Sequence, residues 1–279
     1  MTIARPTTLP GALDALAGHP DAQLLAGGTD LMIEVNHGHR RPEAIVALRR
    51  VQELAGITVT PRGIDLGAGV TYAQIETDLI QQAPGLVMAS RTVGSPQIRN
   101  AGTVGGNIGT ASPAGDALPW LLAMQAEVQI ASPDGPRQLP LEQLITGPKT
   151  TSLGPSDIIH RIHIPPVNGP QHVAKIGPRS AMAISVASLA MVVDTDAKAV
   201  RVALGSVGPT PLRPTAAEEQ ISAAIDWDAM TCTPDDVTTF AGLCAQAARP
   251  ITDHRSTQAY RRHAVGVLAS RTLTRCLFA

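Results

Sequence analysis

The chain has very few aromatic residues. Phe, Trp and Tyr together make up 2% of its 279 residues, with two of each. Flat side chains on which nucleic-acid bases could stack are therefore scarce. The hydrophobic content of 44% must come mainly from aliphatic side chains, and it is ample for a folded core.

Neither basic nor acidic residues are in excess. The chain carries 22 basic and 23 acidic residues, which gives a formal net charge of -1. This balance argues against the basic surface that binds nucleic acid or an anionic membrane.

Cysteine is scarce and widely spaced. Cys232, Cys244 and Cys276 form no C-x-x-C pair, which argues against an Fe-S cluster or a structural zinc ion held by this chain. The N-terminal stretch MTIARPTTLPGALDAL lacks the apolar core of a signal peptide. The most apolar run, 181–193, is too short to span a bilayer. Because such cysteines suit a reducing compartment, we expect a cytoplasmic protein.

Length and pattern predict an α+β fold in two domains, because the chain exceeds the usual single core of about 100 to 200 residues. Residues 1–55 resemble a small α/β unit, whereas 56–168 mix helices with antiparallel hairpins. The stretch IHIPPVNGPQ at 162–171 interrupts regular structure. We therefore predict a domain boundary here, between a domain at 1–168 and a C-terminal domain at 171–279 that has two strands followed by three helices.

Three polar residues are placed where helices should begin. Thr8 precedes a short apolar stretch, and Thr71 has Gln74 three residues later, which is the spacing of a capping box. Asp116 precedes a helical stretch that runs to Met124, and is expected to cap it.

Two segments share a Gly-Gly pair followed by small hydroxyl or amide side chains. They are LLAGGTDL at 24–31 and TVGGNIGTASPAGD at 103–116. Glycine permits a positive φ and a close approach of ligand to backbone. Consecutive N–H groups in such turns bind anions without a cation, so a diphosphate is the predicted ligand. The alternative is that both segments are only tight turns.

Other phosphate and metal signatures do not match. LGAGVTY at 66–72 supplies G-x-G but no G-x-x-G continuation, and TGPKTTS at 146–152 lacks the glycine before lysine of a Walker A loop. The pairs His37/His39 and His160/His163 have no evident third ligand. A nicotinamide enzyme, a P-loop nucleotidase and a metal site are therefore not predicted.

Four segments carry a resemblance to a known family. They are LLAGGTDLMIE, VGSPQIRNAGTVGGNIGTASPAGDALP, ALGSVGPTPLR and YRRHAVGVLASRTL. In order along nearly the whole chain, they resemble the FAD-binding middle (medium) subunit of the xanthine dehydrogenase and carbon monoxide dehydrogenase family of molybdenum hydroxylases. The resemblance implies the two-subdomain FAD-binding fold of the vanillyl-alcohol-oxidase/PCMH type, followed by a smaller α+β domain of the CO dehydrogenase flavoprotein type.

The resemblance also implies that the two glycine segments hold the FAD diphosphate between them. The positions that match are Leu24, Leu25, Ala26, Gly27, Gly28, Thr29, Asp30 and Leu31 in the first segment, and Thr103, Val104, Gly105, Gly106 and Asn107 in the second.

Five further positions match cofactor contacts of the family. Val93 lies ten residues before the second segment, and Asp116 matches a carboxylate that accepts hydrogen bonds from cofactor hydroxyls. Ser112 matches a ligand or supporting hydroxyl, or is an ordinary turn serine. Ile159 matches an apolar residue whose backbone lies near the flavin ring, or is a core residue. Lys175 matches a cation near the pyrimidine end of the isoalloxazine, or is a solvated surface lysine.

The chain departs from the family at two places. Many members read MDIA where this chain has MAIS at 182–185, so a carboxylate is missing at Ala183. In self-contained relatives of the fold, a histidine near the first Gly-Gly often tethers the flavin covalently. Thr29 and Asp30 occupy that stretch here, so we expect non-covalent FAD.

The resemblance implies an oxidoreductase subunit that relays electrons through FAD to a terminal acceptor. The chain lacks ligands for 2Fe-2S clusters and molybdenum, so these are expected on a small and a large partner subunit, in a dimer of heterotrimers. The molybdenum subunit then selects the substrate. The alternatives are a stand-alone non-covalent flavin oxidase or dehydrogenase, which needs its own substrate pocket, and a flavin- or nucleotide-binding assembly module without turnover.

Overall fold

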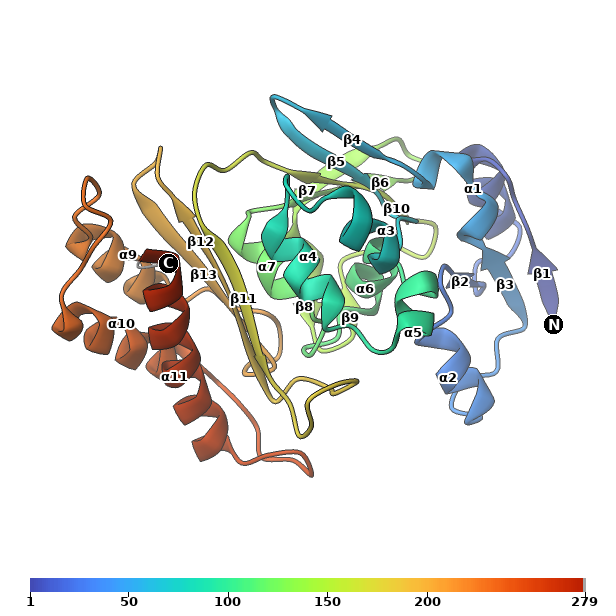
Figure 1. Cartoon of the computed structure of the whole chain (residues 1–279). Helices are drawn as coiled ribbons and strands as arrows, with labels where there is room; N and C mark the ends of the chain where they lie inside the picture. Colours follow the sequence, from blue (N-terminus) through green and yellow to red (C-terminus); the bar gives the residue numbers. More distant parts are fainter. Residues whose placement is uncertain (278–279) are drawn as a thin grey trace.

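The computed structural model describes residues 1–277. The chain forms an N-terminal part (1–55), a middle part (56–168) and a C-terminal part (171–277), which follow one another across the molecule (Figure 1). Helices and strands occur in all three parts, which confirms the predicted α+β class. Within the described residues, no helix is long and apolar enough to cross a membrane.

The N-terminal part is built on a small parallel sheet. In spatial order its strands are β1 (Thr2–Ala4), β3 (Ala44–Ala47) and β2 (Gln23–Leu25). Its helical segments are α1 (Leu9–Ala17), α2 (Leu31–Asn36) and the short 3-10 turns η1 (Leu48–Arg50) and η2 (Gln52–Leu54). Thr8 caps α1 as predicted, since its Oγ1 accepts the Gly11 N–H. The first glycine pair lies between the end of β2 and the start of α2.

The middle part is built on an antiparallel sheet of five strands. In spatial order they are β4 (Ile57–Thr60), β5 (Gly63–Gly67), β10 (Ile158–Ile164), β6 (Glu127–Ala131) and β7 (Arg137–Pro140). The two predicted hairpins, β4–β5 and β6–β7, are both present. A second, two-stranded sheet pairs β8 (Ile145–Gly147) with β9 (Thr150–Thr151).

Helices of one or two turns connect and cover this sheet. They are α3 (Tyr72–Asp78), α4 (Pro84–Arg91), α5 (Pro96–Ala101), α6 (Val104–Thr110), α7 (Leu118–Ala123) and α8 (Leu141–Leu144). The capping box at the start of α3 is confirmed: the Thr71 side chain accepts the Gln74 N–H, and the Gln74 side chain accepts the Thr71 N–H.

Two local predictions in this part are wrong. The stretch 104–110 is helix α6 and not a turn, and Thr103 caps its first turn by accepting the Gly106 N–H at 3.0 Å. Asp116 does not cap α7: the residue before that helix is Ala117, and no side chain caps it. The Asp116 carboxylate is instead occupied by a lysine from another part of the chain.

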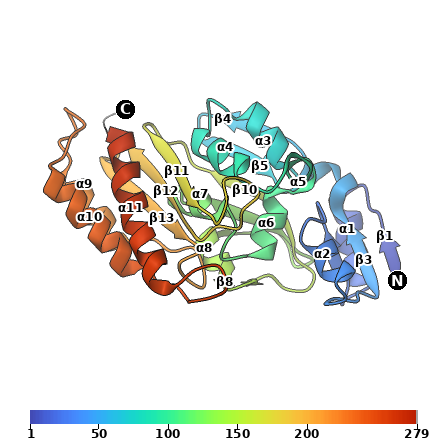
Figure 2. The ribbon, with the colours of Figure 1, turned by 60° about the horizontal axis from the view of Figure 1, so that its bottom comes forward.

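The C-terminal part is a three-stranded antiparallel sheet covered by three helices. The strands, in order, are β11 (Gln171–Ile176), β12 (Ala187–Asp194) and β13 (Ala199–Gly205). The helices are α9 (Thr215–Ala224), α10 (Pro234–Ala247) and α11 (Gln258–Leu277), as the sequence predicted. They lie at the opposite end of the molecule from β1, with α6 between (Figure 2).

The central strand β12 is buried along its whole length. Leu189, Met191 and Val193 pack in the core formed with α9, α10 and α11, whereas Ala190 and Val192 belong to the core of the middle part. Alternate residues of a strand point to opposite faces, so one sheet serves both cores. Helices α4 and α7 therefore cover the face of this sheet that its own helices leave free (Figure 1).

Candidate FAD site

One cavity of about 850 Å³ receives residues from all three parts of the chain. Most of the predicted site residues line it: Leu24, Ala26, Gly27, Gly28, Thr29, Asp30, Leu31, Val93, Thr103, Gly105, Gly106, Asn107, Ser112, Asp116 and Ile159. Leu25, Val104 and Lys175 are not in its lining. The structure thus brings together residues that lie more than 130 positions apart in sequence.

The two glycines of the first segment are needed for different reasons, one for its backbone conformation and the other for close packing. Gly28 has φ +75°, a conformation that glycine adopts without strain. At Gly27 an added Cβ would overlap the carbonyl oxygen of Ala101, so close packing against the middle part requires glycine there. The backbone N–H groups of 27–31 make no hydrogen bond with the residues that the structure describes. They form a run of free donors on the cavity wall, as an anion-binding turn requires.

The second glycine segment does not form such a turn. Neither Gly105 nor Gly106 has a positive φ. The Gly105 N–H already donates to the Ala68 carbonyl at 2.9 Å, and the Gly106 N–H donates to Thr103 Oγ1. Gly105 is required because an added Cβ would come within 2.6 Å of Ala68 Cβ and O. The expectation of equivalent amide nests in both segments is therefore wrong: the first offers free donors, and the second offers a close-packed wall.

Side chains from the two segments meet across the cavity. Thr110 Oγ1, at the end of α6, donates to Asp30 Oδ2 at 3.3 Å. Lys149 Nζ lies 2.7 Å from Glu34 Oε1, and Arg40 Nε lies 2.6 Å from Glu34 Oε2. The hydrogen bond from Lys149 is the main reason why the pKa of Glu34 is lowered. The contacts of Thr110 and Lys149 join the middle part to the N-terminal part, whereas the Arg40–Glu34 pair lies within the N-terminal part.

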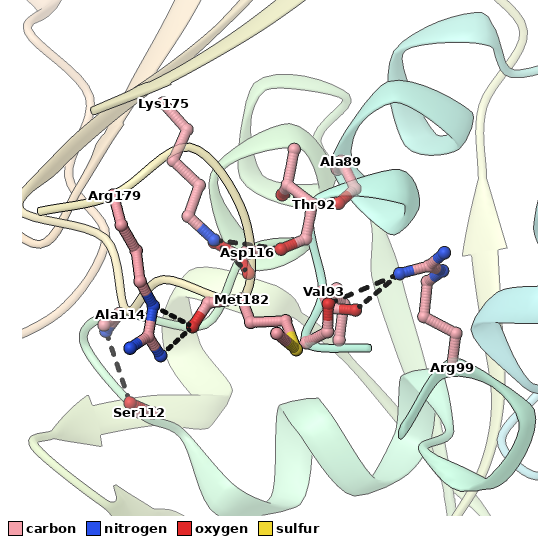
Figure 3. A network of polar contacts seen from close by, with 11 residues as sticks. Ala89, Thr92, Val93, Arg99, Ser112, Ala114, Asp116, Lys175, Arg179 and Met182 are labelled. Carbon is pink, nitrogen blue, oxygen red and sulfur yellow. Dashed lines mark hydrogen bonds and ion pairs between the residues drawn. The ribbon is translucent and has the colours of Figure 1, made fainter. Parts of the chain in front are cut away.

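Asp116 and Lys175 form an ion pair between the middle and C-terminal parts (Figure 3). Lys175 Nζ lies 2.8 Å from Asp116 Oδ2 and donates to the Thr92 carbonyl at 3.1 Å. With a side chain only 10% exposed, Lys175 is not a solvated surface lysine. Burial raises the pKa of Asp116 to about 6, although the charge of Lys175 and its hydrogen bond act to lower it.

Three buried polar atoms of the cavity lining have no partner among the described residues. They are Tyr72 Oη, Asn107 Oδ1 and Asp116 Oδ1. A buried polar atom without a partner costs free energy, so such atoms are expected to meet a ligand or water. Burial also raises the pKa of Tyr72 well above its usual value, so its hydroxyl stays neutral and can donate.

The remaining predicted residues lie on the cavity wall in mixed roles. Ser112 Oγ accepts the Ala114 N–H at 3.3 Å, the contact of a turn serine, while Ser112 also lines the cavity. Ile159 is buried in the core and lines the cavity as well. Arg99 holds the backbone of Val93 by donating a hydrogen bond to the Val93 carbonyl (Figure 3).

The C-terminal part adds a segment to the cavity. Residues 177–185 join β11 to β12, and Met182, Ala183 and Ile184 line the cavity. Arg179 closes this segment on itself by donating to the Ala181 carbonyl. It also donates to the Met182 carbonyl (Figure 3). Ala183, the position at which the family resemblance implies a carboxylate, therefore lines the same cavity.

Comparison with known proteins places the chain in a family. A model described as "FAD binding domain in molybdopterin dehydrogenase" matches residues 1–167, which is more than half of the chain. The chain belongs to this family. A second model, described as "CO dehydrogenase flavoprotein C-terminal domain", matches residues 172–276.

Individual relatives of the molybdopterin dehydrogenase FAD-binding family match most or nearly all of the chain. The chain is 32% identical to the xanthine dehydrogenase FAD-binding subunit of Escherichia coli O157:H7, over 99% of this chain and 95% of the relative. It is 33% identical to the nicotinate dehydrogenase FAD-subunit of Eubacterium barkeri, over 78% of each chain. A solved carbon monoxide dehydrogenase from Hydrogenophaga pseudoflava superimposes with a TM-score of 0.88 at 25% identity, over 99% of this chain and 96% of that one. The predicted resemblance, fold and oxidoreductase family are confirmed.

The cavity of this family member fits the FAD that the family binds. Its volume lies within the range of ligand pockets, about 300 to 1,000 Å³. The free N–H groups of 27–31 suit a diphosphate, and the unpartnered oxygens of Asn107 and Asp116 suit hydroxyl and N–H donors. Glycines at 27 and 105 keep the two walls close together.

Sequence reasoning missed Tyr72, Arg40, Lys149 and the segment 182–184 as parts of the cavity. Lys149 belongs to TGPKTTS, which carries a lysine among small residues but matches no phosphate loop. Its partner Glu34 is 115 positions away, and no local pattern connects the two. Tyr72 sits in the first turn of α3, where the capping box alone explains the local sequence.

Proposed function

We propose that this chain is the FAD-binding electron-transfer subunit of a heteromeric molybdenum hydroxylase. It takes electrons from 2Fe-2S clusters on a small partner subunit and passes them to a terminal acceptor, while a large molybdopterin subunit oxidises the substrate. The observation that carries the proposal is the cavity where free backbone donors, the unpartnered Oδ1 of Asp116 and the family's two glycine segments meet.

Each wall of the cavity has a distinct task in holding FAD. The N–H groups of 27–31 bind the diphosphate, with Thr29 as an additional hydroxyl donor. Asp116 accepts hydrogen bonds from cofactor hydroxyls through its free Oδ1. Ile159 and Val93 pack against the ring system, and Lys175 fixes Asp116 from the C-terminal part. We assign these contacts to domains at 1–168 and 171–279.

The cofactor is held without a covalent bond. Among the described residues, the cavity lining contains neither histidine nor cysteine, the side chains that most often tether flavins in this fold. Bound flavin supplies a carrier that takes up two electrons and releases them singly or as a hydride. The residues of the chain need only bind it, orient it and limit the access of water, so a nucleophile and base are not required.

The chain functions in a dimer of heterotrimers in the cytoplasm. Two relatives are named as subunits of larger enzymes, the 6-hydroxypseudooxynicotine dehydrogenase complex of Paenarthrobacter nicotinovorans and carbon monoxide dehydrogenase of Hydrogenophaga pseudoflava. Among residues 1–277, no group of three or more His, Cys, Asp or Glu side chains is arranged to hold a metal ion. The metal centres belong to partner subunits in this proposal, and those subunits select the substrate.

The proposal is tested first on the purified chain. Titration with FAD is expected to saturate at about one FAD per chain, and acid precipitation is expected to release the flavin into the supernatant. Flavin retained in the precipitate would contradict non-covalent binding. An absence of saturable FAD binding would contradict the proposed function itself.

A further inference from the structure

Arg261 is a buried arginine that bonds residues adjoining two segments of the cavity lining. It lies in α11, its side chain is 5% exposed, and it belongs to YRRHAVGVLASRTL, a segment with no residue in the cavity lining. One guanidinium nitrogen donates to the carbonyls of Val186 at 2.8 Å and Ser206 at 2.9 Å. The other donates to Asp253 Oδ1 at 2.7 Å. A buried charge is tolerated only when it is paired in this way.

The first of these carbonyls is at the base of a cavity segment. Val186 directly follows the segment 177–185, which supplies Met182, Ala183 and Ile184 to the lining. The Val186 N–H donates to the Ile176 carbonyl at 2.8 Å and so closes the base of the segment. Arg261 holds the carbonyl of the same residue, and thereby fixes where the segment enters β12.

The second carbonyl belongs to Ser206, a residue that bonds another segment of the cavity lining. Ser206 donates its N–H to the carbonyl of Pro113 at 2.8 Å, which crosses from the C-terminal part to the middle part. Pro113 lies within the stretch 112–116, where Ser112, Ala114, Gly115 and Asp116 line the cavity. Ser206 has φ +64°, a strained backbone for a residue other than glycine. The bond from Arg261 to the Ser206 carbonyl helps to hold that strained conformation.

We propose that Arg261 is a positioning residue of the FAD site, which holds the segments 112–116 and 177–186 in register across the boundary between the two domains. The proposal rests on the proposed function, because it concerns the same cavity. Arginine is required, since its planar fork bonds two carbonyls and a carboxylate at once, and a lysine ammonium at the end of a flexible chain does not reproduce this geometry.

A neighbouring ion pair supplies the matched control. Arg213 pairs with Glu218 at 2.7 Å in the same C-terminal part, and Glu218 also accepts the Val202 N–H. Neither residue lines the FAD cavity or bonds a segment that does. Arg213→Gln therefore removes a similar interaction and lowers stability without disturbing 112–116 or 177–186.

The test compares full-length wild type, Arg261→Gln, Arg261→Lys and Arg213→Gln. Hydrogen exchange is followed by mass spectrometry in the FAD-free chains, and the dissociation constant for FAD and the visible circular dichroism of the bound flavin are then measured. In Arg261→Gln we expect faster exchange in 112–116 and 177–186, about tenfold weaker FAD binding and an altered flavin spectrum. Arg213→Gln is expected to show none of these changes. Arg261→Lys keeps the charge near Asp253 and is expected to give the same local pattern with a smaller loss of stability.

The outcomes separate this inference from the proposed function. If wild type binds FAD and Arg261→Gln binds it equally well, the positioning role is wrong. It is also wrong if the control Arg213→Gln speeds exchange in the two segments as much as Arg261→Gln does. Should Arg261→Gln fail to fold, Arg261→Lys decides by the same criteria. If wild type itself does not bind FAD, the proposed function fails and takes this inference with it.

Discussion

Asp116 is the residue at which burial, an ion pair and an unpartnered oxygen coincide. Its side chain is 13% exposed, Oδ2 is held by Lys175, and Oδ1 is free within the cavity. Burial raises its pKa from 3.8 to about 6. The folded chain therefore binds this proton more tightly than the unfolded chain does. The contribution of Asp116 to the stability of the FAD-free chain falls as the pH rises from about 4 to 6.

The same residue gives FAD binding a pH dependence. A cofactor hydroxyl that donates to Asp116 favours the carboxylate, so binding lowers the pKa of Asp116 and releases a proton. We expect affinity for FAD to increase about tenfold between pH 5 and pH 7. Fluorescence titrations across this range, with Asp116→Asn as the comparison, measure the effect. A profile in Asp116→Asn as steep as that of wild type would show that another group titrates.

Gly27 is expected to be more sensitive to substitution than most glycines of the chain. In Gly27→Ala the added Cβ would overlap the Ala101 carbonyl oxygen, so the two cavity walls must separate. We expect loss of most FAD binding in this variant. Gly242→Ala is the control, because nothing lies within 4 Å of an added Cβ in α10, and alanine there should stabilise the helix by about 0.5 to 1 kcal/mol. Unchanged FAD occupancy in Gly27→Ala would contradict the close approach of the two walls.

At the scale of elements, helix α6 contributes its N-terminal cap and its first turn to the cavity wall. Its cap Thr103 lines the cavity and accepts the Gly106 N–H. Thr103→Ala should lower the free energy of unfolding by about 1 kcal/mol and weaken FAD binding as well. Thr233→Ala, which removes the cap of α10 away from the cavity, should cost a similar amount of stability with no effect on FAD. Denaturant unfolding and FAD titration of both variants measure these effects, and equal FAD affinity in the two would exclude a role for Thr103 at the site.

Elements with local signals could be predicted from sequence. The Thr71/Gln74 capping box and the two hairpin turns each depend on residues within a few positions. Helix α6 could not be predicted, because its sequence VGGNIGT is rich in glycine and poor in helix-forming residues. Long-range bonds stabilise it instead: the Val104 N–H donates to the Val70 carbonyl, and the Gly105 N–H donates to the Ala68 carbonyl.

The same distinction applies to the candidate site. The family resemblance predicted which residues lie around one cavity. All residues of 24–31 and 103–107 line it, with the exception of Leu25 and Val104. Their chemistry was predicted less well: the N–H groups of Gly105 and Gly106 are already bonded within the protein, and Asp116 pairs with Lys175 in place of capping α7. Both differences depend on contacts between distant segments, which local spacing does not encode.

At the scale of the whole molecule, the C-terminal sheet joins the domains into one body. Strand β12 is buried on both faces, with Ala190 and Val192 packed in the core of the middle part. Lys175 of this sheet bonds the cavity residue Asp116, and the segment 182–184 between β11 and β12 lines the cavity. The C-terminal domain thus completes the FAD cavity from one side, and the N-terminal part closes it from the other.

The central claim is that the chain relays electrons only within its complex. The most direct test is anaerobic mixing of the substrate of the molybdenum subunit with the assembled complex and, separately, with this FAD-loaded chain alone, while the visible absorbance of the flavin is followed. The account predicts bleaching in the complex and none in the isolated chain. Bleaching of the isolated chain by the organic substrate would contradict the relay and favour a stand-alone flavin enzyme.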